Sequence, residues 1–179
     1  FFKIILFAPS IISSIVIVTV FMQFVESGIP SLLKEIFNIE MLGLLANGDT
    51  RLITVIFYNT WIGFGISTLL YVSAMDSINT SVIEAAKMDG VNRFQEFIHI
   101  IMPSIWPTFT QFFIISVGGM FINQLNLFAF YGEAADSGIY TFGYYLYKNV
   151  LGASTGEIPY LATVGIILTI VTVPLTMIV

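Results

Sequence analysis

The chain has 179 residues, of which 57% are hydrophobic and only 9% are charged. Soluble domains typically carry about 25% charged residues, so this composition excludes a water-facing surface over most of the chain and favours lipid as its solvent. A formal net charge of −5, a single histidine and no cysteine also argue against a nucleic-acid partner, a multi-histidine metal site and thiol chemistry.

Four apolar stretches are long enough to cross a bilayer as helices, which requires about 20 residues. In chain order they cover residues 4–25, 52–74, 105–127 and 159–179. Helices satisfy their backbone hydrogen bonds internally, as lipid demands. The sequence therefore predicts an all-α fold, a polytopic transmembrane helical bundle that forms one domain over 1–179. Pro9 falls in the opening turns of the first span, and Pro174 is expected to kink the last one.

Two of the three connections contain short helical candidates. In residues 26–50, Gly28 and Pro30 are expected to end the helix of the first span. Residues 29–39 are expected to form a short interfacial helix. Residues 128–158 are rich in tyrosine, glycine and acidic residues, with a helical candidate at 139–151 whose tyrosines suit a membrane surface.

The middle connection, residues 76–103, has a charged helical pattern. Ser81 is expected to cap its first helix, with Glu84 three residues later completing a capping box. Ala85 and Ala86 then give that helix a smooth surface that another protein can approach closely.

The second half of this connection predicts a turn and another helix. Gly90 is a natural helix terminator, with Asp89 either capping the turn or contacting a partner. A second short helix is expected from Asn92, and Pro103 is expected to open the next span. The middle connection is thus predicted to be a helix–turn–helix between two membrane spans.

Loop charges leave the orientation of the spans open. Alternating spans place three basic residues on each side of the membrane: Lys3, Lys87 and Arg93 on one, Lys34, Arg51 and Lys148 on the other. The positive-inside rule therefore gives no answer here.

The middle connection resembles the "EAA" loop of binding-protein-dependent ABC importer permeases. The match is carried by Glu84-Ala85-Ala86, Gly90 and Pro103. Further similarity covers nearly all of the chain and favours the carbohydrate, maltose-permease-like branch; it lies in Leu6–Pro9, Asn59–Gly65 and Ala74–Thr80.

The resemblance implies an orientation and a mechanism. The EAA loop would be cytoplasmic, and its short helix would dock in a cleft of an ATP-binding subunit. Glu84 would pair with a basic group there, in a coupling element formed by Glu84, Ala85, Ala86, Asp89, Gly90 and Pro103. Residues 26–50 and 128–158 would then lie outside and receive an extracytoplasmic binding protein.

The resemblance also implies partners and a location. The chain would be a transport subunit and not an enzyme, in the bacterial cytoplasmic membrane, with a second permease subunit in a heterodimer and two ATP-binding subunits. ATP and Mg would sit on those ATP-binding subunits, and no cofactor is expected on this chain. Consistently, the sequence has no Gly-rich phosphate loop ending in Lys-Ser/Thr.

Polar residues within the spans suggest a pathway for the cargo. Asn59 and Gly63, four residues apart, share one face of the second span, and Ser116, Met120 and Asn123 are expected to share a face of the third. Matching positions in maltose-type permeases line the substrate cavity. The alternative is that these groups hold helices together by hydrogen bonds.

Other functions remain open at this stage. An importer of the same type could carry amino acids, peptides or other small solutes. A remote alternative is an intramembrane serine protease, from Gly65-Ile66-Ser67, with His99 as the only histidine; another is a membrane anchor without a pore. An ion-coupled carrier is disfavoured because no charged residue lies deep in a span. The chain begins without Met and ends in an apolar run, so we expect a piece of a longer protein.

Overall fold

The computed structural model describes Pro9 and residues 11–178, so the predicted opening of the first span at residues 4–8 lies outside the described residues. The helices and helical turns are α2 (Ser14–Gln23), η1 (Phe24–Gly28), α3 (Ile29–Phe37), α4 (Gly48–Asp76), α5 (Thr80–Met88), α6 (Arg93–Glu96), η2 (Phe97–Ile101), α7 (Met102–Gly119), α8 (Leu127–Tyr131), η3 (Ser137–Ile139), α9 (Phe142–Gly152) and α10 (Ile158–Ile178). No strand occurs in this described part, and the predicted all-α class is confirmed.

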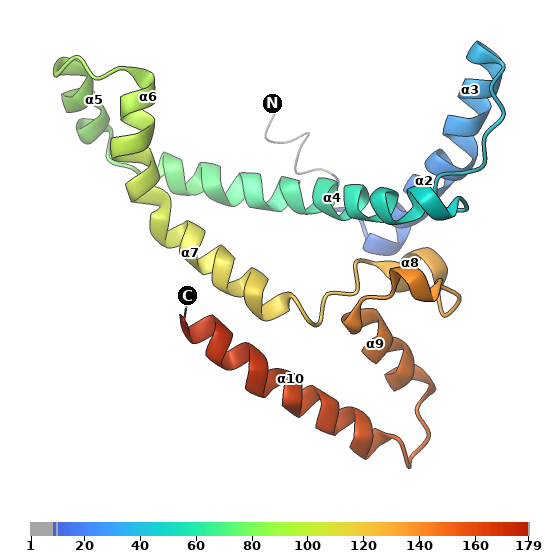
Figure 1. Ribbon diagram of the computed structural model, residues 1–179. Helices are drawn as coiled ribbons and strands as arrows, with labels where there is room; N and C mark the ends of the chain where they lie inside the picture. The colour runs from blue at the N-terminus through green and yellow to red at the C-terminus, as the bar shows by residue number, and fades with distance from the viewer. Residues whose placement is uncertain (1–8, 10, 179) are drawn as a thin grey trace.

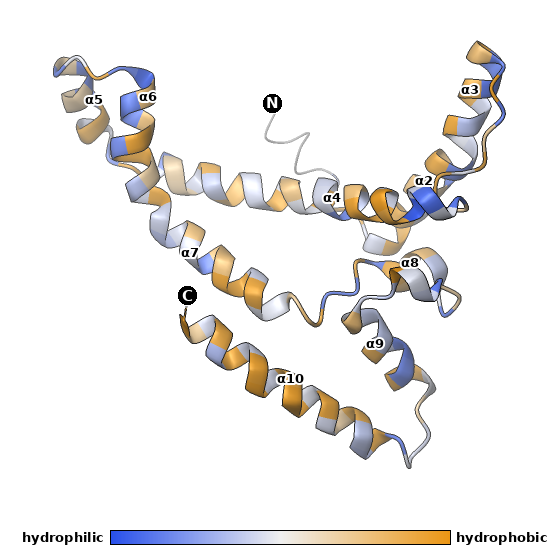
Figure 2. Ribbon diagram, in the orientation of Figure 1, coloured by the Kyte–Doolittle hydropathy of each residue, from blue (hydrophilic) through white to orange (hydrophobic). Residues whose placement is uncertain are grey.

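Four helices are long and apolar enough to cross a membrane: Ser14–Phe37, Gly48–Asp76, Arg93–Gly119 and Ile158–Ile178. Their apolar composition is visible along the ribbons in Figure 2. The last of them, α10, has no buried residue along its described length. The faces of this helix are therefore left for lipid or for other membrane helices.

Two predicted helix boundaries at prolines are wrong, for the same physical reason. Pro30 and Pro103 each follow a π-helical turn, η1 and η2 respectively. The residue before each proline donates its backbone hydrogen bond to the carbonyl five positions earlier. These bonds run from the Ile29 N–H to the Phe24 carbonyl and from the Met102 N–H to the Phe97 carbonyl. This wider turn accommodates a ring that would strain an ordinary helix. Both helices therefore continue through their proline.

The first helix runs without a break from Ser14 to Phe37, so Gly28 and Pro30 do not end it. The expected helix at 29–39 is present as α3 and ends at Asn38, which has a left-handed φ of 55°. Leu32 and Phe37 on α3 are exposed, and the location of this helix at a membrane surface stays a prediction.

The third span also differs from the predicted range of 105–127. Its helix begins at Arg93 and ends at Gly119, after which residues 120–126 form turns and irregular chain. Adjacent glycines at 118 and 119 are weak helix formers, and Leu125 and Asn126 have left-handed φ angles of 50° and 55°. The apolar composition of 120–127 therefore misled the prediction.

The short elements lie at the two ends of the molecule (Figure 1). One end carries α5 and α6; the other carries α3, α8 and α9. Between them run α4, α7 and α10, with α7 in contact with both α4 and α10. The helix predicted at 139–151 forms as α9, which starts later because the Thr141 hydroxyl accepts a bond from the Tyr144 N–H at 3.1 Å.

The buried core lies at the end that carries α8 and α9. Val18 on α2, Tyr58 on α4, Leu127 on α8 and Tyr144 on α9 are almost fully buried there. The Tyr58 ring packs edge-on against Phe130, with 5.0 Å between centroids. Packing is therefore tightest where the connections fold over the ends of α2 and α4.

Candidate functional site

The N-cap of helix α5 lies two residues earlier than predicted. Its N-cap is Asn79, whose side-chain oxygen accepts bonds from the Ser81 N–H at 3.0 Å and the Ser81 hydroxyl at 2.9 Å. Asparagine is among the best N-cap residues, and with Asn79 extended Ser81 falls inside the first turn. The predicted capping box between Ser81 and Glu84 is therefore absent from this described helix, and Glu84 lies in its middle with an exposed side chain.

The turn after α5 is formed as predicted. Gly90 has a φ of 77°, which only glycine adopts at little cost. The Gly90 N–H donates to the Lys87 carbonyl at 3.2 Å, and the Val91 N–H donates to the Ala86 carbonyl at 3.1 Å. These two bonds form a Schellman motif, so the prediction that Gly90 terminates the helix is confirmed.

The second helix is also present from Asn92. Its side chain accepts from the Gln95 N–H at 2.9 Å, while the Gln95 side chain accepts from the Asn92 N–H at 3.0 Å. This reciprocal capping box fixes the start of α6. Because α6 continues through η2 into α7, this surface turn is joined to a membrane-length helix without a loop.

The outward surface of α5 combines one carboxylate with apolar side chains. Val82 and Met88 are 48% and 84% exposed, and Glu84 and Ala85 are exposed between them. Ala86 is instead buried at 8%, so only Ala85 of the alanine pair offers the smooth outward surface that the sequence suggests. Such an exposed apolar helix with a central acid is suited to a groove on another protein.

A cavity of about 500 Å³ separates α5 from the following helices. It is lined by Ala86, Asp89, Gly90, Val91, Gln95, His99 and Ile100. His99 Nδ1 lies 3.1 Å from the Gln95 carbonyl, one helical turn away. Ser67 lies on α4, and in the described part of the chain no hydrogen bond links it to His99.

Asn59, a predicted pathway residue, forms side-chain hydrogen bonds to other residues of this chain. Its amide nitrogen donates at 2.8 Å to the Val55 carbonyl and at 2.8 Å to the Leu125 carbonyl. Its oxygen accepts from the Asn126 amide at 2.7 Å. Both of its N–H donors are thus used, and the bonds tie α4 to the irregular segment 120–126.

The other predicted pathway residues do not form one helical face. Ser116 lies in α7, Met120 is the residue that follows its last turn, and Asn123 lies in the irregular segment. Asn123 Oδ1 accepts from the Leu125 N–H at 2.8 Å and so shapes that segment. Gly63 is exposed on α4. Lining of a cargo pathway by these residues stays a prediction.

A polar network at the other end was not foreseen from the sequence. Arg51 donates to Asp136 at 2.9 Å and to the Leu45 carbonyl at 3.0 Å. Glu26, in η1, accepts from the Leu45 and Ala46 N–H groups at 2.6 and 3.0 Å. The network joins α2–α3, α4 and the connection after α8. Its members are up to 110 residues apart, so spacing gives no signal for it.

This network predicts a pH dependence of stability. The Gly138 N–H and the Arg51 guanidinium bond to Asp136 and hold the pKa of its carboxyl below the ordinary value. A depressed pKa contributes stability above the unfolded pKa of about 4, and this contribution is lost as pH falls through the lower folded value. The thermal stability of the wild-type protein should exceed that of Asp136→Asn at pH 6, and the difference should shrink towards pH 3. An unchanged difference over that range would contradict the assignment.

Comparison with known proteins places the chain among membrane transport components. The family model described as "Binding-protein-dependent transport system inner membrane component" matches residues 1–179. A probable ABC transporter permease protein, YurN of Bacillus subtilis, is 26% identical over 95% of this chain and 60% of its own length. The multiple sugar-binding transport system permease protein MsmF of Streptococcus mutans is 25% identical over 96% of this chain and 59% of its own.

One further relative and one solved structure extend the comparison. The arabinooligosaccharides transport system permease protein AraP of Bacillus subtilis is 27% identical over 95% of this chain and 55% of its length. The fold is similar to a crystal structure of a bacterial alginate ABC transporter in complex with an alginate pentasaccharide-bound periplasmic protein. The TM-score is 0.79 and the identity 21%, over 98% of this chain and 62% of that one.

The chain thus spans little more than half the length of the curated relatives described above. The chain is a multi-pass membrane protein that belongs to the family of binding-protein-dependent transport system inner membrane components.

Proposed function

We propose that the chain is the core of a permease subunit that carries a carbohydrate through the bacterial cytoplasmic membrane in an ABC importer. The observation that carries this proposal is the exposed helix α5, with Glu84 at its middle, joined by a fixed turn to the helix Arg93–Gly119. The names of relatives that transport multiple sugars and arabinooligosaccharides support the class of cargo.

In this proposal α5 couples the permease to an ATP-binding subunit. Glu84 enters a groove of that subunit and pairs with a basic side chain, while Val82 and Met88 cover the rim. Removing one partner of such a pair costs about 2–5 kcal/mol when the pair is buried and hydrogen-bonded, because the other charge is left unpaired. Asp89 and Gly90 hold the turn through which α6 follows any displacement of α5.

The remaining parts of the importer are assigned by the same proposal. ATP and Mg bind to two copies of the ATP-binding subunit, and this chain binds no cofactor. A second permease subunit pairs with this one as a heterodimer, and an extracytoplasmic binding protein delivers the cargo to the end that carries α3, α8 and α9.

The test is uptake by cells that express the whole importer, wild type or Glu84→Ala, offered labelled oligosaccharides, polyols and amino acids. We expect uptake of one carbohydrate class, reduced at least tenfold in Glu84→Ala because a charge pair is lost at the coupling contact. Co-purification of the ATP-binding subunit with the permease measures the same contact directly.

Glu35→Ala is the matched control, because Glu35 is also an exposed helical glutamate but lies on α3 at the opposite end. Co-purification of the ATP-binding subunit with this variant should equal that of the wild type, because α3 lies at the end that the proposal assigns to the binding protein. Undiminished uptake in Glu84→Ala would contradict the coupling role, and uptake of amino acids alone would keep the importer and overturn the cargo class.

A further inference from the structure

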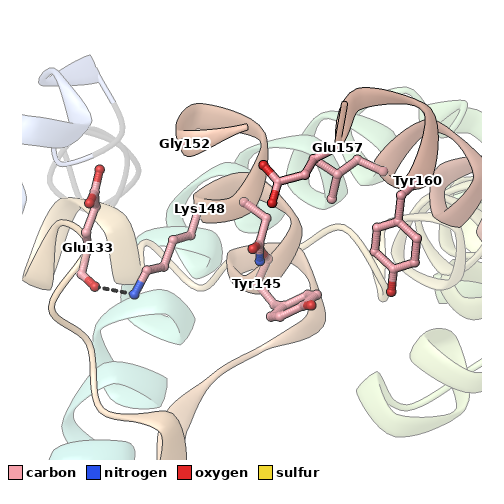
Figure 3. Close-up of a pocket in the computed structure, with 8 residues that line it drawn as sticks. Glu133, Tyr145, Lys148, Gly152, Glu157 and Tyr160 are labelled. Atoms are coloured by element: carbon pink, nitrogen blue, oxygen red, sulfur yellow. Dashed lines mark hydrogen bonds between the residues drawn. The ribbon is translucent and has the colours of Figure 1, made fainter. Parts of the chain in front are cut away.

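A cavity of about 380 Å³ opens between α9, the start of α10 and the connection that follows α8. Figure 3 shows the side chains that line it, and it lies at the end opposite α5 and α6 (Figure 1). The polar and aromatic residues that line it are Glu133, Tyr145, Lys148, Asn149, Glu157 and Tyr160. Its volume is within the range of small-molecule sites, about 300–1,000 Å³.

Two charged groups of this cavity are held in fixed positions. The Lys148 ammonium donates to the Glu133 carbonyl at 2.6 Å (Figure 3). It also donates to the Tyr140 hydroxyl at 3.1 Å. Glu157 Oε2 accepts from the Ser154 N–H at 2.9 Å and from its hydroxyl at 2.8 Å. The bond to Tyr140 raises the pKa of Lys148, and the bonds from Ser154 lower that of Glu157. Both groups therefore stay charged near neutral pH.

The hydrogen-bonding groups that remain are mainly acceptors. The Asn149 amide nitrogen donates one of its two N–H groups to the Tyr145 carbonyl at 2.7 Å, and its side-chain oxygen, with two lone pairs, is left to accept. The carboxylates of Glu133 and Glu157 can only accept when ionised. Lys148 already uses two of its three N–H donors. A matching ligand must therefore donate several hydrogen bonds.

Charge and shape narrow the ligand further. Two carboxylates against one ammonium give the cavity a net negative charge, which disfavours an acidic ligand. Tyr145 and Tyr160 are 41% and 63% exposed, so their rings offer apolar faces beside these acceptors. A ligand with many hydroxyl donors, an apolar ring face and no negative charge satisfies all of these conditions.

We propose that this cavity is a binding site for a neutral saccharide, which donates hydroxyl hydrogen bonds to Glu133, Asn149 and Glu157 and rests its ring face on Tyr145 and Tyr160. The inference rests on the proposed function, because it places this site where cargo reaches the permease. It adds that neutral sugars bind there and sugars bearing carboxylates do not.

The test measures equilibrium binding to the complete importer in lipid nanodiscs, without the binding protein. Maltotriose is the neutral ligand and trigalacturonate the acidic one. Tyr145→Ala should weaken maltotriose binding about tenfold, the change expected for loss of one well-packed aromatic contact. Tyr147→Ala is the matched control, since Tyr147 is 40% exposed on the same helix and does not line the cavity. Maltotriose binding by this variant should equal that of the wild type.

The acidic ligand tests the charge argument. Trigalacturonate should bind at least tenfold more weakly than maltotriose, and the difference should narrow in Glu133→Gln, which removes one negative charge. Equal maltotriose binding by wild type and Tyr145→Ala would overturn the site. Tight trigalacturonate binding, or displacement of maltotriose by a small amine with higher affinity, would overturn the ligand class.

Uptake measured in parallel separates this inference from the proposed function. Carbohydrate uptake by the intact importer together with unchanged maltotriose binding in Tyr145→Ala would refute the site and leave the transport function standing. Absence of carbohydrate uptake in cells would refute the proposed function itself.

Discussion

Replacing Gly143 by alanine should destabilise the protein by about 3 kcal/mol or more, the largest effect that we expect from a single methyl group. A Cβ at this position would overlap the Ile122 carbonyl oxygen and lie 2.8 Å from the Asn123 carbonyl carbon. Both are backbone atoms of the irregular segment 120–126, so no flexible side chain can move aside. Either α9 or that segment must shift, which would disturb the buried position of the neighbouring Tyr144.

The measurement is the free energy of unfolding of the purified protein in mild detergent, by denaturant titration. Gly152→Ala is the control, because Gly152 lies at the end of the same helix and an added Cβ meets nothing within 4 Å. Alanine is also the better helix former, so this variant should match or exceed the wild type. If Gly143→Ala were as stable as Gly152→Ala, α9 would not be packed closely against the segment 120–126.

Replacing Asn59 by leucine should cost about 2–4 kcal/mol of stability. Leucine has a similar size but removes all three hydrogen bonds of the side chain, and it leaves the Leu125 carbonyl and the Asn126 amide without this partner. Leaving a partly buried polar group unpaired costs about 1–3 kcal/mol. Because Leu125 and Asn126 have left-handed φ angles, the loss should also loosen their conformation.

The same unfolding titration tests this prediction, with hydrogen exchange of the 120–126 amides as a local readout. Thr60→Val is the control, since among the residues that the structure describes the Thr60 hydroxyl bonds only to the Ile56 carbonyl of its own helix, at 2.9 Å. We expect faster exchange in Asn59→Leu and wild-type behaviour in Thr60→Val. If Asn59→Leu kept wild-type exchange and stability, the side-chain amide of Asn59 would not be what holds the segment 120–126 in place.

The sequence predicted the features that depend on local chemistry. Apolar runs of sufficient length indicated the four membrane-length helices, and a glycine after a helical pattern indicated the turn at Gly90. Asn92 likewise marked the start of α6. Each of these depends on residues within a few positions of one another, where spacing is informative.

The errors lie where distant segments decide the outcome. Residues 120–127 are apolar enough to continue a helix, but Asn59 and Gly143 hold the chain in another conformation there. Pro30 and Pro103 look like helix breaks, but each follows a π-helical turn that takes up the strain. The pairing of Arg51 with Asp136 and the cavity beside Tyr145 depend on contacts across the fold that no local pattern reports.

The unbroken helix from Arg93 to Gly119 has a mechanical consequence. At about 1.5 Å per residue, its 27 residues make a rod about 40 Å long. One tip of this lever is the reciprocal cap at Asn92, and the other meets the irregular segment that Asn59 fastens to α4. A rotation of the rod by about 5° displaces its far tip by about 3.5 Å. Because Asn59 fastens the segment 120–126 to α4, that displacement is passed on to α4 at this point.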